Sequence, residues 1–143
     1  MTKFRKAKSS DVDKVFQLIN ELEDGKLDKD RFCGVFENNL LDPNINYILA
    51  IDNSAIAGFL SLHIQELLHH TGKVAEIQEL FIDEEMRGQG IGEKLVNEAR
   101  RIAAEEQCIL IEVSTNIKRE RAQKFYEEKA RFRKTHYKFT DKI

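Results

Sequence analysis

A mixed α/β fold is predicted by three observations: the order of the elements, a turn signal between two apolar strands, and a helix that opens on closely spaced glycines. The predicted order is one strand, two helices, three strands, and then helix, strand, helix and strand. Two consecutive helices directly after the first strand argue against a doubly wound nucleotide-binding fold, which alternates from its start. We therefore expect a central, mostly antiparallel sheet flanked by helices.

The first elements follow from apolar spacing and from capping residues. Residues 3–8 alternate like a strand, and residues 9–24 begin with a serine typical of a helix N-cap and continue with apolar residues at helical spacing. Phenylalanines 32 and 36 and Leu40 lie four apart in a second helix, within residues 28–41. That helix should end before Asp42-Pro43, because the residue before a proline disfavours helical geometry.

The remaining elements are strands with short connections and two more helices. Residues 46–67 predict two strands joined at Asp52-Asn53-Ser54, a hairpin. The helix over 91–107 carries one apolar stripe, formed by Ile91, Leu95, Ala99 and Ile102. The other predicted segments are a strand at 73–83, a strand at 108–115, a helix at 119–130 and a strand at 136–140.

The size and composition predict a single domain spanning residues 1–143. The 143 residues are 41% hydrophobic and 34% charged, enough for one buried core. A net charge of −2 favours neither nucleic acid nor an anionic membrane as a partner. Without a long apolar run or a signal-peptide h-region the protein should be cytoplasmic, with Cys33 and Cys108 reduced.

The segment RGQGIG, residues 87–92, places three glycines before a helix. Its spacing fits neither a P-loop nor a dinucleotide fingerprint. Alternate glycines let the backbone turn sharply and present N–H groups at a helix N-terminus, where the dipole favours an anion. Arg87 can reach the same anion. A plain tight turn into the helix is the alternative, but one or two glycines would satisfy it.

The stretch LFIDEEMRGQGIGEKLV resembles the acetyl-coenzyme A signature of the GNAT superfamily of N-acetyltransferases, with Arg87, Gly90 and Gly92 in its three fixed places. Glu84 stands where many members have proline. The resemblance implies that acetyl-CoA is the co-substrate and that its thioester carbonyl meets the main chain near Phe81 and Ile82, where two parallel strands separate. The implied pyrophosphate cradle is Arg87, Gly88, Gln89, Gly90, Ile91, Gly92 and Glu93.

Acetyl transfer also needs a base for the ammonium and a proton for the departing thiolate. Glu76 and Glu79 are the candidate bases, although they point to opposite faces of an ideal strand unless a bulge intervenes, and Glu76 is slightly favoured. Tyr126 lies where GNAT members hold a tyrosine acid; a core aromatic is the alternative. Asn116 resembles a residue that contacts pantetheine, but it could equally be a cap.

Further segments, including LLDPNINYILA, LHIQELLHH, EIQEL and STNIKR, resemble GNAT enzymes that acetylate aminoalkylphosphonates. That resemblance implies a small primary amine as acceptor, direct transfer in a ternary complex, and a homodimer. The alternatives are another amine, such as an aminoglycoside, a polyamine or a protein amine, or an acyl-CoA sensor without catalysis.

Two groups of polar residues keep open interpretations. Among His63, His69 and His70 we expect one histidine to line the substrate site, and a bound divalent metal is the minority alternative because adjacent strand residues point apart. The basic side chains Lys118, Arg119, Arg121 and Lys124 could contact phosphate or could form a solvated helix face. No aromatic interleaving accompanies them, so we expect no nucleic-acid binding.

Overall fold

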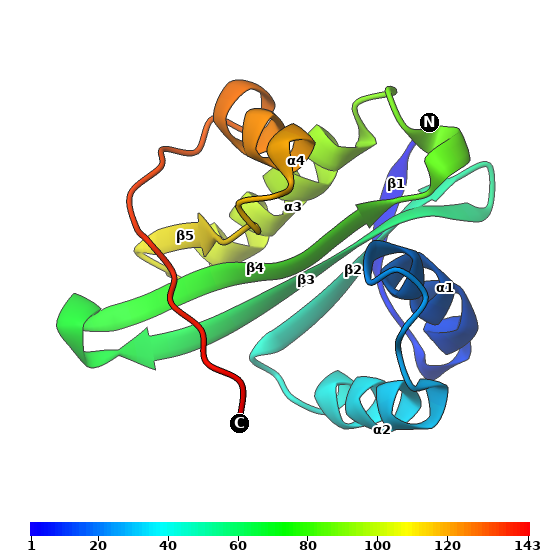
Figure 1. Ribbon diagram of the computed structural model, residues 1–143, viewed down its shortest axis with the longest axis horizontal. Coiled ribbons are helices and arrows are strands. Elements are labelled where there is room, and N and C mark those ends of the chain that lie inside the picture. The colour runs from blue at the N-terminus through cyan, green and yellow to red at the C-terminus, as the bar shows by residue number, and fades with distance from the viewer.

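The computed structural model describes all residues, 1–143, as a five-stranded sheet with helices on both faces (Figure 1). The strands are β1 (Lys3–Lys6), β2 (Ile45–Asp52), β3 (Ala55–Leu67), β4 (Gly72–Ile82) and β5 (Leu110–Val113). The helices are α1 (Val12–Leu22), α2 (Lys29–Leu40), α3 (Ile91–Glu105) and α4 (Glu120–Lys124). A π-helical turn, Phe125–Lys129, extends α4. The mixed α/β fold predicted from the sequence is therefore confirmed.

The sheet order is β1-β2-β3-β4-β5, antiparallel from β1 to β4 and parallel between β4 and β5. The parallel pair follows from the crossover through α3, because parallel neighbours need a long connection. β4 and β5 pair only from Val74 opposite Leu110 to Ile77 opposite Val113. The main chain of β4 from Gln78 to Ile82 therefore has β3 on one side and no strand on the other.

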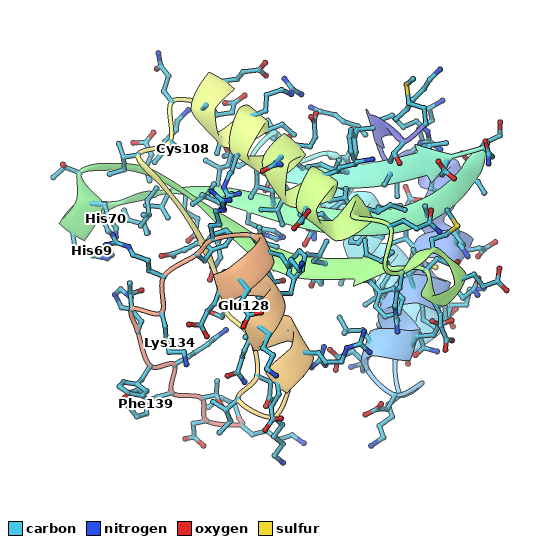
Figure 2. The ribbon with its side chains drawn as sticks, turned by 90° about the horizontal axis from the view of Figure 1, so that it is seen from above. His69, His70, Cys108, Glu128, Lys134 and Phe139 are labelled. Carbon is cyan, nitrogen blue, oxygen red and sulfur yellow. The ribbon has the colours of Figure 1, made fainter.

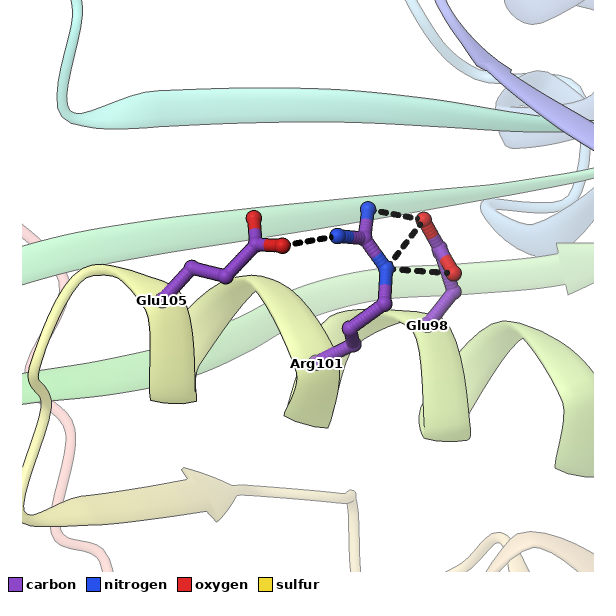
Figure 3. A network of polar contacts seen from close by, with 3 residues as sticks. All are labelled: Glu98, Arg101 and Glu105. Atoms are coloured by element: carbon purple, nitrogen blue, oxygen red, sulfur yellow. Dashed lines mark hydrogen bonds and ion pairs between the residues drawn. The ribbon is translucent and has the colours of Figure 1, made fainter.

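Two apolar cores lie on opposite faces of the sheet. α1 and α2 bury Val15, Leu18 and Phe36 against Leu49, Phe59 and Phe81. α3 covers the other face with its predicted stripe, and Ile91, Leu95 and Ala99 are buried there against Leu60, Leu62 and Ile77. The opposite side of α3 is solvated and carries an ion-pair network in which Arg101 bridges Glu98 and Glu105 (Figure 3). We call the α1–α2 side of the sheet the acceptor face and the α3 side the rear face.

Of two expectations about helix ends, one is corrected and one is confirmed. No serine side chain caps α1: Ser9–Asp11 form a 3-10 turn, and the carboxylate of Asp11 instead accepts the main-chain N–H of Lys8 at 2.7 Å. Because Ser9 lies within that turn, it is too early to cap a helix that begins at Val12. The end of α2 at Leu40, before Asp42-Pro43, is confirmed.

The predicted last strand, residues 136–140, does not form. The chain after α4 turns at Arg131, whose φ is 61°, and then runs without regular structure beside the sheet, past its β5 edge (Figures 1 and 2). Tyr137 and Phe139 remain 93% and 91% exposed, and Phe139 lies well away from the sheet (Figure 2). The alternation of side chains was correct for a strand, but a strand also needs a neighbouring main chain to pair with.

Candidate functional site

The loop between β4 and α3 uses its three glycines in two different ways. Gly88 and Gly90 have φ of 80° and 78°, the left-handed region that a side chain disfavours, and open space surrounds both. Gly92 has no such φ, but a Cβ there would lie 3.1 Å from Cζ of Phe125. The first two glycines therefore shape the loop, and the third lets α3 pack closely against the π-helical turn.

The loop presents main-chain donors at the start of α3. Gly90 is the N-cap, so the N–H groups of Ile91, Gly92 and Glu93 have no partner within the helix. Residues 88–90 are exposed, whereas the side chain of Ile91 is buried and can contribute only its main chain. Free N–H groups at the positive end of a 15-residue helix form a site suited to a phosphate.

Arg87 lies beside this helix start. Its Nε donates to the carbonyl oxygen of Ile82 at 3.2 Å, and its guanidinium sits 5.0 Å from the centre of the Phe81 ring. A cavity of about 380 Å³ separates this arginine from the end of α1, and it is lined by Asn20, Glu21, Asp24, Gly25, Phe81, Glu84 and Arg87. The guanidinium is therefore placed next to the loop and to an open space.

Glu76 and Glu79 lie on the same face of the sheet because of a bulge. Ser61 pairs with Glu79 and the next residue, Leu62, pairs with Ile77, so Gln78 is one extra residue on β4. A bulge of this kind shifts the alternation of side chains by one. Both glutamates consequently face the acceptor side, and the sequence expectation of opposite faces held only for an unbroken strand.

Ser61 holds Glu79 in place and was missed by sequence reasoning. It is fully buried, its hydroxyl donates to the carboxylate of Glu79, and its Oγ accepts the main-chain N–H of Glu79 at 3.1 Å. Tyr47, opposite Ser61 on β2, has a raised pKa because of burial, with the charge of Glu79 adding to the effect. A serine between apolar residues in FLSLH was the available signal.

Glu76 is more loosely held and lies in a polar row across three strands. It pairs directly with His63 on β3 and with Glu112 on β5, so the three side chains share the acceptor face. Its Oε1 accepts from Nε2 of Gln78 at 2.8 Å. Glu76 is half-buried, and no buried hydroxyl engages it as Ser61 engages Glu79.

Tyr126 lies in the π-helical turn between the rings of Phe125 and Phe132, with centroids 5.2 Å and 5.9 Å away. Burial raises the pKa of its phenol from 10.0 to about 12, and the positive charge of Arg119 partly opposes that shift. The phenol is therefore protonated at neutral pH. The ring packs against the rear-face core, as the core-aromatic alternative expected, and its role as the acid stays a prediction.

Arg119, at the start of α4, binds the end of α1. Its Nη2 donates to the carbonyl oxygen of Leu22 at the end of α1, at 3.0 Å, and lies 3.9 Å from Glu23. Lys118, Arg121 and Lys124 are exposed, as expected for a solvated face. The basic stretch thus has one member with a specific structural contact.

Asn116 lies in a turn next to Arg119, and the histidine pair lies on the β3–β4 hairpin. The Oδ1 of Asn116 accepts the N–H of Lys118 at 2.9 Å, so its exposed side chain closes a local turn. His69 and His70 form a 3-10 turn at the far end of the β3–β4 hairpin (Figure 2), with ring centroids 4.2 Å apart. No group of three or more His, Cys, Asp or Glu side chains is arranged to hold a metal ion.

The arrangement of a helix start with free N–H groups, an unpaired β4 edge and a half-buried tyrosine matches a known class of protein. The acetyltransferase (GNAT) family profile matches residues 12–132, and the chain belongs to this family. It is an N-acetyltransferase. Aminoalkylphosphonate N-acetyltransferase from Salmonella typhimurium is 43% identical over 136 residues, which cover 95% of this chain and 88% of the relative.

Solved structures share the fold. A protein from Bacillus halodurans described as a transcriptional regulator is 25% identical, with a TM-score of 0.91 and full coverage of both chains. Glucosamine-6-phosphate N-acetyltransferase from Arabidopsis thaliana is 21% identical, with a TM-score of 0.80 over 100% of this chain and 99% of that one. No helix here is both long and apolar enough to cross a membrane.

Proposed function

We propose that the chain transfers the acetyl group of acetyl-CoA directly to the primary amine of an aminoalkylphosphonate, within a ternary complex. The observation that carries the mechanism is the bulge at Gln78, which puts Glu76 and Glu79 together beside the unpaired edge of β4. The similarity to the Salmonella typhimurium aminoalkylphosphonate enzyme supports this acceptor.

The cofactor fits along the loop and β4. The N–H groups at the start of α3 and the guanidinium of Arg87 would bind the pyrophosphate. The main chain near Phe81 and Ile82 has no strand on the side away from β3, so that side could pair with the pantetheine arm and donate an N–H to the thioester carbonyl. Such a donor stabilises the negative charge that develops on the carbonyl oxygen as the amine attacks.

The two glutamates would have different roles toward the amine. An alkylammonium cannot attack until a base, directly or through a water molecule, removes a proton. Glu76 fits the base, because its carboxylate is half-buried and is engaged only by an amide. Glu79, already bound by Ser61, fits an electrostatic anchor for the incoming ammonium.

Tyr126 would supply the proton for the leaving group. As the N–C bond forms and the C–S bond breaks, the electron pair goes to sulfur, and the phenol protonates the coenzyme A thiolate. A phenol kept neutral by burial holds this proton across the physiological pH range. The protonated base and the deprotonated phenol then return to their starting states by exchanging protons with solvent.

Release of free thiol from acetyl-CoA, with and without 2-aminoethylphosphonate, tests the proposal. We expect amine-dependent release that falls at least about 100-fold in Glu76→Gln and clearly in Tyr126→Phe. Glu105→Gln on the exposed side of α3 is the control and should match the wild type.

Each other outcome has a definite meaning. Release with a polyamine or an aminoglycoside, but none with the phosphonate, would overturn the acceptor. Tight coenzyme A binding without release for any amine would support the sensor alternative. A homodimer, a cytoplasmic location and a role for a divalent metal remain expectations from the sequence, as does the contact between Asn116 and pantetheine.

A further inference from the structure

We propose that His63 is the residue that selects for a phosphonate: its imidazole binds the phosphonate group while Glu76, directly opposite on β4, receives the amine. The inference rests on the proposed function and adds a specificity-determining residue to it. It also identifies which of the histidines lines the substrate site.

The position of His63 follows from the strand register. Ser61 faces the acceptor side, because its hydroxyl binds Glu79 there. His63, two residues further along β3, faces the same side and pairs with Glu76. It is half-buried, whereas His69 and His136 are exposed and lie on the hairpin turn and the C-terminal segment.

Among the strand side chains on the acceptor face, His63 is the basic donor without a carboxylate partner, because Arg5 of β1 is bound to Asp11. The side chains that β2 to β5 direct to this face include Glu76, Glu79 and Glu112, but His63 is the only one that is basic. An imidazole offers an N–H to a phosphonate oxygen in either protonation state. A zwitterionic acceptor needs both an acidic and a basic partner, and this pair provides them.

The spacing of the pair suits a short acceptor. Directly opposite residues of antiparallel strands have Cβ atoms roughly 4.5–5.5 Å apart. In 2-aminoethylphosphonate only two carbon atoms separate nitrogen from phosphorus, so both ends can be bound across one strand interval. Glu112 flanks Glu76 on the β5 side and would repel a phosphonate, which orients that group toward β3.

The test compares two amines of similar length in four proteins. The amines are 2-aminoethylphosphonate and n-propylamine, which has no anionic group. The proteins are the wild type, His63→Leu, His63→Gln, which keeps one N–H donor, and His69→Leu as the control. Thermal unfolding of each variant checks that it is folded.

We expect His63→Leu to lower kcat/KM for the phosphonate at least about tenfold, mainly through KM, and to leave the value for propylamine within about twofold. His63→Gln should retain part of the preference, and His69→Leu all of it. Equal losses with both amines, or no loss with the phosphonate, would overturn the inference while the proposed function stands. A wild type that does not turn over the phosphonate would overturn the proposed function, and this inference with it.

Discussion

Arg119 donates a hydrogen bond to the carbonyl oxygen of Leu22, 97 positions earlier in the chain. The last carbonyl groups of a helix have no hydrogen-bond partner within it, and they lie at the negative end of its dipole. A guanidinium at this position supplies both a hydrogen-bond donor and a favourable positive charge. This contact fixes the end of α1, which forms one wall of the cavity beside Arg87. It therefore connects the acceptor-face helices to the segment that leads into Tyr126.

Arg119→Gln should lower the free energy of unfolding by about 1 kcal/mol, at the low end for a charged hydrogen bond because 39% of the side chain is exposed. Urea denaturation measures this change. Arg121→Gln is the matched control, since Arg121 is exposed in the first turn of α4, directly after the N-cap residue Arg119; its effect should stay within about 0.5 kcal/mol. Equal effects of the two changes would mean that the Leu22 contact contributes nothing.

Gly92→Ala should destabilise the protein by roughly 1–2 kcal/mol, because a Cβ 3.1 Å from the Phe125 ring overpacks the contact between α3 and the π-helical turn. Chemical denaturation of Gly92→Ala, Phe125→Leu and the double variant tests this cause. If the ring is responsible, alanine should cost less in the Phe125→Leu background than in the wild type.

Gly34→Ala is the control for Gly92→Ala, and it should change the free energy of unfolding in the opposite direction. Gly34 lies within α2 at a position where a Cβ meets nothing within 4 Å. Alanine there should stabilise by about 0.5–1 kcal/mol through helix propensity alone. A loss of stability at residue 34 would show that factors other than helix propensity and the packing around the added Cβ dominate glycine replacements in this chain.

The phenol of Tyr126 should titrate near 12, well above its ordinary value of 10.0. The folded state holds this proton more tightly than the unfolded state, so the associated stability is present below pH 10 and is lost as the pH rises toward 12. The difference in tyrosinate absorbance between the wild type and Tyr126→Phe during an alkaline titration measures the pKa. A transition at pH 10 would show that burial does not raise the pKa of Tyr126.

Asp11→Asn should cost about 2 kcal/mol at neutral pH, because the buried carboxylate accepts both Nη1 and Nη2 of Arg5, at 2.8 and 2.9 Å. That hydrogen bonding lowers the pKa of Asp11 below 3.8. The stabilisation is therefore present above pH 3.8 and lost as the pH falls through the lowered pKa. Unfolding free energies of both proteins should converge in acid, and a constant difference down to pH 2 would contradict this account.

The sequence was informative for most local signals, although the serine expected to cap α1 does not do so. The helical stripe from Ile91 to Ala99, the turn at Asp52-Asn53-Ser54 and the stop before Pro43 all depend on residues a few positions apart, and all appear in the structure. Such elements are predictable because their local signals agree with one another and with the fold. The strand expected at 136–140 failed because strand formation depends on a distant partner.

The site was harder to predict for the same physical reason. The extra residue at Gln78 exists only relative to β3, so the shared face of Glu76 and Glu79 could not be read from their spacing. Gly92 was expected in the anion cradle with Gly88 and Gly90, and its free N–H still fits that role; its close approach to Phe125, far along the chain, was not foreseen. Phe125 lies next to Gly92 only once α3 and the π-helical turn have packed together.

The contact between Gly92 and Phe125 has a mechanical consequence for the proposed reaction. Coenzyme A is a molecule of fixed length, so an enzyme that grips it by the pyrophosphate must hold its proton donor one cofactor length away. Phe125 rests on the helix start that would grip the pyrophosphate, and Tyr126 is the next residue. The close packing at Gly92 would thus fix the distance between Tyr126 and the pyrophosphate site. That distance would be the same whichever amine occupies the other side of the sheet.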